Sequence, residues 1–200
     1  MANQGVDRGR RRFLVAATSV VGGAGAVALA APLLMSWKPS ARAQAAGAPV
    51  EVNVAQIEPG QRISVGWRGR PIWVVRRTPE MLELLPEIRD RLRDPDSEEV
   101  TQQPDYARNS HRSIRPEILV LVGICTHLGC SPAFRPEIGV ADIGADWPGG
   151  WLCACHGSRF DMAGRVYRNV PAALNLEVPP YRFVNDDLII VGEHADGGTA

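Results

Sequence analysis

A mainly β domain preceded by one transmembrane helix is the fold that this sequence predicts. From residue 50 onward, short runs of alternating and β-branched residues are separated by turn residues, a pattern typical of strands. Residues 13–35 contain no charged side chain and are long enough to cross a membrane as a helix. The four cysteines fall in two clusters, at 125–130 and 153–158, and each cluster also contains a histidine, which indicates metal or redox chemistry.

The length and charge of the chain limit its possible functions. Its 200 residues suffice for one domain of ordinary size plus an extension. The chain has 22 lysines and arginines against 22 aspartates and glutamates, so it has no net field that would attract nucleic acid. We therefore expect no nucleic-acid partner, and the partners must be inferred from a site.

The first segment, residues 1–12, is basic and is expected to stay in the cytoplasm. The run R-R-R-F-L at 10–14 resembles the twin-arginine export signal of bacteria, a route that carries folded proteins. In the alternative interpretation, the basic run only fixes the orientation of the helix in the membrane. Either way, the positive-inside rule places the rest of the chain on the periplasmic side of the bacterial inner membrane.

Residues 13–35 are predicted to form the single transmembrane helix, about 34 Å long at 1.5 Å per residue. Trp37 and Lys38 follow this segment as an interfacial pair would. In an alternative reading, the segment is a signal peptide that is cleaved near the small residues at 41–43. The apolar run is longer than the usual signal core, which favours a permanent anchor.

The anchor is predicted to be joined to the head by a flexible tether, residues 36–49. The stretch 40–49 lacks bulky apolar side chains that would pin it to a core, although its alanines could form a short helix. The head is predicted to span residues 50–192, followed by a C-terminal tail at 193–200. Its expected strands are 50–57, 62–67, 72–77, 118–124, 151–154, 175–178, 181–184 and 188–191.

One helix is expected to interrupt these strands. Thr78 can cap it, Pro79 suits its first position, and it could continue to residue 93 after a break at Pro86. The polar stretch 94–115 is too long and irregular for a tight connection, so we expect it to wrap the surface. His111, in this stretch, and His194, in the tail, are interpreted as surface residues.

Each cysteine cluster offers one thiolate and one imidazole at short spacing. Cys125 and His127 are separated by one residue, and Cys153 and His156 by two. Two such loops, held together by neighbouring strands, match the arrangement in which one iron of a [2Fe–2S] cluster takes two sulfurs and the other takes two histidines. Imidazole ligands make such a cluster less negative than thiolates do, which raises its potential.

These two boxes, together with three other stretches, resemble the Rieske subunit of respiratory quinol–cytochrome c oxidoreductases, the cytochrome bc complexes. The stretches are G-S-R-F-D at 157–161, A-G-R-V at 163–166 and L-N-L-E-V-P-P-Y at 174–181. The N-terminal order of signal, anchor and linker is also similar. The resemblance implies a Rieske-type β-sandwich head with a cluster-binding subdomain that holds one [2Fe–2S] cluster.

The resemblance also implies roles for individual residues. The ligands would be Cys125, His127, Cys153 and His156. A disulfide between Cys130 and Cys155 would link the two loops, and Ser158 would donate a hydrogen bond to a bridging sulfur of the cluster. His156 would be the catalytic residue, since the matching position contacts the quinol and accepts its proton as the cluster accepts an electron.

The partners implied by the resemblance are quinol, cytochrome b and a c-type cytochrome, in a dimeric complex that acts as a translocase-type oxidoreductase. Two departures from the family pattern stand out. Phe160 occupies a position where many members have tyrosine, and residues 170–173 read Val-Pro-Ala-Ala instead of Gly-Pro-Ala-Pro. The first removes a hydrogen-bond donor, and the second leaves the stiffness of the covering loop open.

Two other functions remain possible at this point. Cysteine and histidine at short spacing also form structural zinc sites. The chain could alternatively be the Rieske subunit of a periplasmic oxidoreductase such as arsenite oxidase, an electron relay without a quinol site.

Overall fold

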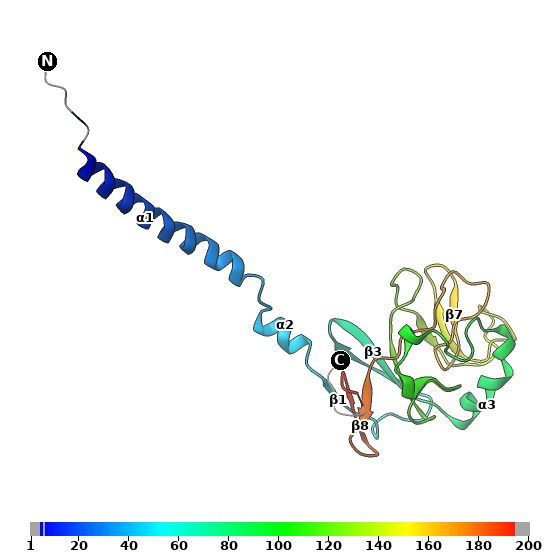
Figure 1. Ribbon diagram of the computed structural model, residues 1–200. Helices are drawn as coiled ribbons and strands as arrows, with labels where there is room; N and C mark the ends of the chain where they lie inside the picture. The colour runs from blue at the N-terminus through cyan, green and yellow to red at the C-terminus, as the bar shows by residue number, and fades with distance from the viewer. Residues whose placement is uncertain (1–4, 6, 195–200) are drawn as a thin grey trace. The chain divides into compact units, whose positions relative to one another are not determined.

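The computed structural model describes residue 5 and residues 7–194, and it divides the chain into two compact units at residues 45 and 46. The N-terminal unit is helical, and the second unit is built of small sheets (Figure 1). Each unit is described by itself. The first four residues, residue 6 and residues 195–200 lie outside the described part, so the predicted tail is described only at its first two positions.

The main element of the N-terminal unit is one long helix, α1 (Arg8–Met35), which is apolar and long enough to cross a membrane. It begins before the predicted span because Asp7 caps it by accepting hydrogen bonds from the backbone N–H groups of Gly9 and Arg10, at 2.9 and 3.1 Å. The basic run is therefore helical as well. The helix ends at the predicted residue, and Ser36 is its C-cap.

A second, short helix, α2 (Ala41–Ala46), lies within the predicted tether. The sequence left a flexible coil and a short alanine helix open for this stretch, and the structure contains the helix. Ser40 starts it by accepting a hydrogen bond from the N–H of Ala43 on its hydroxyl, at 3.2 Å, and one from the N–H of Gln44 on its carbonyl, at 2.9 Å. Alanine is the best helix former, so this sequence can form a turn without tertiary contacts.

The head contains three antiparallel sheets of three strands each, which confirms the prediction of a mainly β fold. Their strand orders are β1-β9-β8, β2-β3-β4 and β5-β6-β7. The strands are β1 (Val50–Asn53), β2 (Arg62–Trp67), β3 (Arg70–Arg76), β4 (Ile118–Val122), β5 (Ala133–Arg135), β6 (Gly150–Cys153), β7 (Ser158–Phe160), β8 (Tyr181–Phe183) and β9 (Leu188–Val191).

The predicted strand at 175–178 is wrong. Three residues of this segment take part in backbone hydrogen bonds with three different parts of the chain: Leu176 with Gly164, Glu177 with Val122, and Val178 with Gln102. No single neighbouring strand pairs with it, and two prolines follow, which cannot donate to a ladder. The three-residue strands β5 and β7 were not predicted, whereas β8, which is equally short, was.

The core is centred on β3 and β4, and every residue of β4 is buried. Trp73 of β3 stacks on Trp151 of β6, with ring centroids 6.0 Å apart and planes 2° from parallel. This contact packs the β5-β6-β7 sheet against the β2-β3-β4 sheet. The sheet that carries the second cysteine cluster is thereby fixed on the main core.

The predicted helix is α3 (Pro79–Glu87), with Thr78 accepting a hydrogen bond from the N–H of Met81. It passes through Pro86 and is followed by a 3₁₀ turn at Arg89–Arg91 rather than by a longer helix. Two more 3₁₀ turns, Val100–Gln102 and Asp105–Ala107, lie in the polar stretch that follows.

That polar stretch does not simply wrap the surface, so the prediction for 94–115 is wrong in part. Arg112 is fully buried and donates to the carbonyl oxygens of Ala163, at 3.2 Å, and Gln102, at 3.2 Å, and to Oε1 of Gln103, at 3.0 Å. Both terminal nitrogens of the guanidinium thus have partners, whereas its buried Nε has none among the described residues. The stretch therefore forms part of the interior of the head.

Candidate metal centre

The first cysteine cluster lies in the loop that follows β4, and the packing of β3 fixes where this loop starts. A side chain at Gly123 would collide with the ring of Trp73, so only glycine allows the backbone to pass there. The loop is closed by two backbone hydrogen bonds, from Cys125 N–H to the Cys130 carbonyl at 2.7 Å and from Gly129 N–H to the Cys125 carbonyl at 3.0 Å.

The second cluster forms the tight turn between β6 and β7. Cys153 is the last residue of β6 and is paired with Ser158, the first residue of β7. The N–H of Gly157 donates to the Cys153 carbonyl at 2.8 Å, and Gly157 has a φ of 76°, a left-handed conformation that favours glycine. Residues 154–157 therefore form a short exposed turn, and His156 lies in it.

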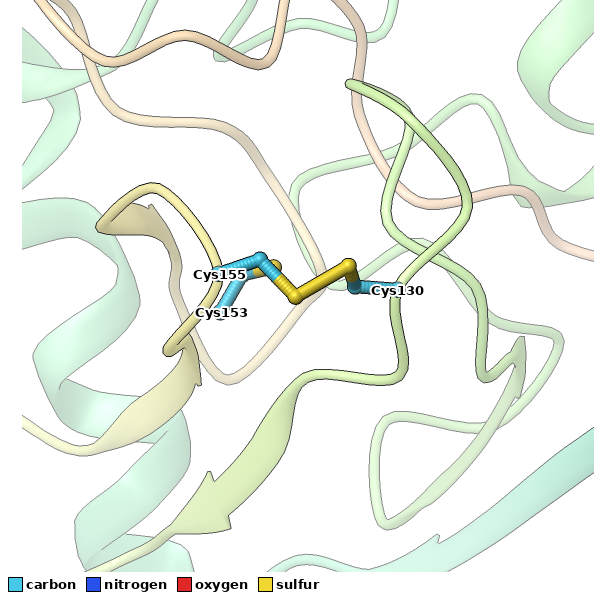
Figure 2. Close-up of side chains that lie close together, drawn as sticks. All are labelled: Cys130, Cys153 and Cys155. Atoms are coloured by element: carbon cyan, nitrogen blue, oxygen red, sulfur yellow. A yellow bond between two sulfur atoms is a disulfide. The ribbon is translucent and has the colours of Figure 1, made fainter.

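A disulfide between Cys130 and Cys155 joins the two loops (Figure 2). The sulfur of Cys153 also lies nearby, because the three sulfur atoms are within 4.8 Å of one another. Two of these sulfurs are bonded to each other, so Cys153 alone of the three offers a thiol to a metal. The pairing is the one that the resemblance implied.

The other two cysteines, Cys125 and Cys153, are free thiols and are each 2% exposed. Burial raises the pKa of the Cys125 thiol, and contact with the Cys153 side chain raises it further. Hydrogen bonds from the His127 backbone and the Ser158 side chain lower it in part. Two buried thiols side by side resist ionisation, because each thiolate would lie in an apolar site next to the other. A metal cation bound between them would offset both negative charges, so it would favour the thiolate form.

The two histidines of the clusters also lie side by side. The ring centroids of His127 and His156 are 4.8 Å apart, and the planes meet at 88°. His156 is exposed, whereas Nδ1 of His127 is buried and has no hydrogen-bond partner in the described part of the chain. A buried imidazole nitrogen without a partner is costly, unless it serves as a metal ligand.

These observations fit a two-iron cluster. The two loops supply two buried thiols and two adjacent imidazoles, and the remaining pair of cysteines is used in the disulfide. In a two-iron cluster of this kind, one iron takes the two thiolates and the other takes the two imidazoles. A single zinc ion would take all four ligands together, so it would not require thiol to lie beside thiol and ring beside ring.

The segment 170–174 is hydrogen-bonded to both loops. The hydroxyl of Ser158 accepts a hydrogen bond from the N–H of Ala172 at 3.0 Å, and the hydroxyl of Thr126 donates to the carbonyl of Leu174 at 2.6 Å. This covering segment is therefore attached to each cluster loop, although it lacks one proline and one glycine of the family pattern.

A buried ion pair below the second loop was not predicted from the sequence. Asp161 and Arg165 are 0% and 1% exposed at their side chains and lie 2.7 Å apart. Asp161 also accepts the N–H groups of Ala163 and Arg165, and Arg165 donates to the Leu85 carbonyl at 2.7 Å. These bonds fix the chain just after β7. Both residues lie in stretches that carry the resemblance, but only the structure gives them a role.

The two histidines outside the clusters are less exposed than expected. His111 and His194 are both half-buried, so the prediction of surface residues holds only in part. Burial lowers the pKa of His111, and the neighbouring guanidinium of Arg77 lowers it further. Neither histidine is among the residues of the candidate centre.

Comparison with protein families gives two matches. Residues 49–180 match the family model described as "Rieske [2Fe-2S] domain", which covers more than half of the chain. Residues 1–40 match the model described as "Ubiquitinol-cytochrome C reductase Fe-S subunit TAT signal".

The chain is also similar to individual proteins. It is 57% identical to the ubiquinol-cytochrome c reductase iron-sulfur subunit of Allochromatium vinosum, over 100% of this chain and 95% of that one. The corresponding subunit of Blastochloris viridis is 42% identical, with 92% of each chain covered. A solved structure titled "Hyperthermophilic respiratory Complex III" shares 26% identity over 88% of this chain and 98% of that one, with a TM-score of 0.48.

Proposed function

Because the chain belongs to the Rieske iron–sulfur subunits of ubiquinol–cytochrome c reductase, the cytochrome bc complex, we propose that its head takes an electron from quinol and delivers it to a c-type cytochrome. It is a subunit of an oxidoreductase complex, its head is a Rieske [2Fe–2S] domain, and its N-terminal helix fits a membrane anchor. The alternatives of a zinc protein and of an arsenite oxidase subunit are not favoured by this membership.

The proposed ligands are Cys125 and Cys153 for one iron and His127 and His156 for the other. The observation that carries this proposal is the pairing in the two loops, where two buried free thiols touch and two imidazoles lie 4.8 Å apart. The bound cluster supplies one-electron chemistry at a raised potential. Ser158, which hydrogen-bonds the Cys125 side chain in this structure, is proposed to donate to a bridging sulfur when the cluster is bound.

His156 is proposed to receive the proton of the quinol. It is the exposed histidine of the pair, so the ring nitrogen that is not a ligand can reach a substrate hydroxyl. Its Nε2 would accept that proton, which makes proton and electron uptake coupled events. Leu128, 72% exposed beside His127, and Leu174, 36% exposed, give the surrounding surface apolar character that suits a lipid-soluble quinol.

The other proposed partners follow from the family. We expect cytochrome b to take the second electron of the quinol and a c-type cytochrome to accept the electron from the head. We also expect a dimeric complex of the translocase type. The head is proposed to lie in the periplasm, because the arginines precede the apolar helix and the first 40 residues match a twin-arginine signal model. The residue boundaries of anchor, tether, head and tail given above are part of this proposal.

The four ligands are tested by single substitutions, Cys125→Ser, Cys153→Ser, His127→Gln and His156→Gln, in the full chain. Each change should abolish the bound cluster, measured as iron per chain, and also the quinol-driven reduction of a c-type cytochrome in membranes. His111→Gln, a histidine outside the clusters, should retain both. A full and spectroscopically normal cluster in any of the four variants would refute the ligand assignment.

A further inference from the structure

A polar hollow opens beside His156, on the side of the second loop. Its volume is about 340 Å³, and it is bordered by the turn residues His156 and Gly157, by Arg159 of β7, and by the segment 167–171. Tyr167, Arg168 and Asn169 are its other polar members. The lining contains two guanidinium groups and an imidazole, and it contains no carboxylate.

Arg159 points into this region because of the alternation of β7. Ser158 and Phe160 are buried on the core face, so the side chain between them projects from the opposite face. Arg159 is half-buried, and its guanidinium makes no hydrogen bond or ion pair with any residue that the structure describes. A half-buried cation without a counter-charge is an unusual group to place beside a redox centre.

Arg168, in contrast, is held in place. Its Nε donates to the carbonyl of Leu92 at 2.8 Å, and its backbone N–H donates to the carbonyl of Arg91 at 2.8 Å. No other hydrogen bond of its guanidinium to the described residues is present, so its terminal nitrogens remain available. The nearby carboxylate of Asp146 is already paired with Arg91, at 2.7 Å.

From this arrangement we propose that the Arg159 pocket, formed by His156, Arg159, Arg168 and Asn169, binds an oxyanion of the phosphate or carboxylate class. Arginine presents its N–H donors in a planar fork that matches two oxygens of such a group, and the bound anion would supply the counter-charge that the two arginines lack. The oxyanion is either a free inorganic anion or a carboxylate on the electron-accepting partner. Only the second source rests on the proposed function.

The first experiment uses inorganic phosphate as the probe and the full chain with its cluster in detergent. Binding is measured by calorimetry at constant ionic strength, for the wild type, Arg159→Gln and Arg108→Gln. Arg108 is exposed and lies outside the pocket, so it is a control with the same change in charge. We expect Arg159→Gln to weaken phosphate binding at least tenfold, Arg159→Lys to weaken it less, and Arg108→Gln to leave it unchanged.

The second experiment measures how fast the reduced chain passes its electron to a c-type cytochrome, at several salt concentrations. If the occupant is a carboxylate of the partner, Arg159→Gln should slow this step at least tenfold at low salt, while Arg108→Gln has a much smaller effect. Iron content and the spectrum of the cluster, measured on the same samples, show that each variant is correctly folded.

The inference is overturned if Arg159→Gln and Arg108→Gln behave alike in both experiments. Specific loss of phosphate binding supports a free anion, and specific slowing of the cytochrome step supports a partner carboxylate. If the wild type fails to reduce any c-type cytochrome, the proposed function fails. The phosphate experiment then still decides whether the pocket is an oxyanion site.

Discussion

At the scale of single residues, the two free cysteines and the two histidines of the clusters differ in burial, and the difference matches their proposed roles. The thiols of Cys125 and Cys153 are buried and adjacent, the imidazole of His127 has a buried nitrogen without a partner, and His156 is exposed. The same four residues were predicted as ligands because their spacing in sequence is distinctive. Their relative burial was not predictable, since it depends on β3 and β4 beneath the loops.

Phe160 provides a test of how hydrogen bonds set the potential. It is fully buried and lies on the same face of β7 as Ser158, which bonds Cys125. Phe160→Tyr should place a hydroxyl near the thiolate ligands and stabilise the more negative, reduced cluster. A bond worth about 0.5–1.5 kcal/mol, at about 59 mV per 1.4 kcal/mol for one electron, raises the potential by roughly 20–60 mV.

Redox titration of both proteins at one pH checks this prediction, with Phe183→Tyr in β8 as a control that should not shift the potential. The free energy of unfolding is measured alongside. A buried hydroxyl without a partner would destabilise the head by about 1–3 kcal/mol. An unchanged or lowered potential in a variant of undiminished stability would contradict the hydrogen-bond argument.

At the scale of the elements, local patterns predicted most of the long strands and the start of the one helix in the head. Thr78 and Pro79 mark the start of α3, and β2, β3, β4 and β9 are close to their expected ranges. The errors lie in segments whose conformation depends on contacts with distant parts of the chain. The segment 175–178 bonds three separate partners, and the polar stretch 94–115 is drawn inward by Arg112 and Arg77.

The disulfide is the element that links the two cluster loops, and its removal should be visible in two quantities. It closes a loop with a sequence separation of 25 residues, so a change of Cys130 and Cys155 to serine should destabilise the head by roughly 3–4 kcal/mol. Looser loops should weaken the hydrogen bonds to the Cys125 sulfur and lower the potential, while the cluster remains bound.

Chemical unfolding and redox titration of this double variant test the prediction, with iron content as the control for the ligands. Two free thiols at positions 130 and 155 in the oxidised, non-reduced protein would contradict it. So would a variant whose stability and potential both equal those of the parent.

At the scale of the whole molecule, the two units have different sequence signatures, and these were readable in advance. The anchor is recognised by its uncharged run and the head by its β pattern and cysteine clusters. The tether lacks both signals. Its short helix α2 rests on alanine propensity and two bonds to Ser40, so the sequence left helix and coil as open alternatives.

We expect the head to move on its tether between a quinol site and a cytochrome site, so the tether should also influence turnover. Prolines at positions 43 and 44 disrupt α2 and restrict the backbone to extended conformations. These substitutions should slow steady-state reduction of the cytochrome without changing the spectrum of the cluster. Glycines at the same positions are the flexible control and should be tolerated. Unchanged turnover in several proline variants would count against motion as a necessary step.

The most direct test of the central claim is electron paramagnetic resonance of membranes that contain the full chain, with and without a quinol-site inhibitor. We expect the signal of a reduced Rieske cluster, lost in His156→Gln, and a change in its line shape when the inhibitor binds. That result would place the cluster next to the quinol site. A chain without this signal, or with a signal that no quinol-site inhibitor alters, would contradict the proposed role in quinol oxidation.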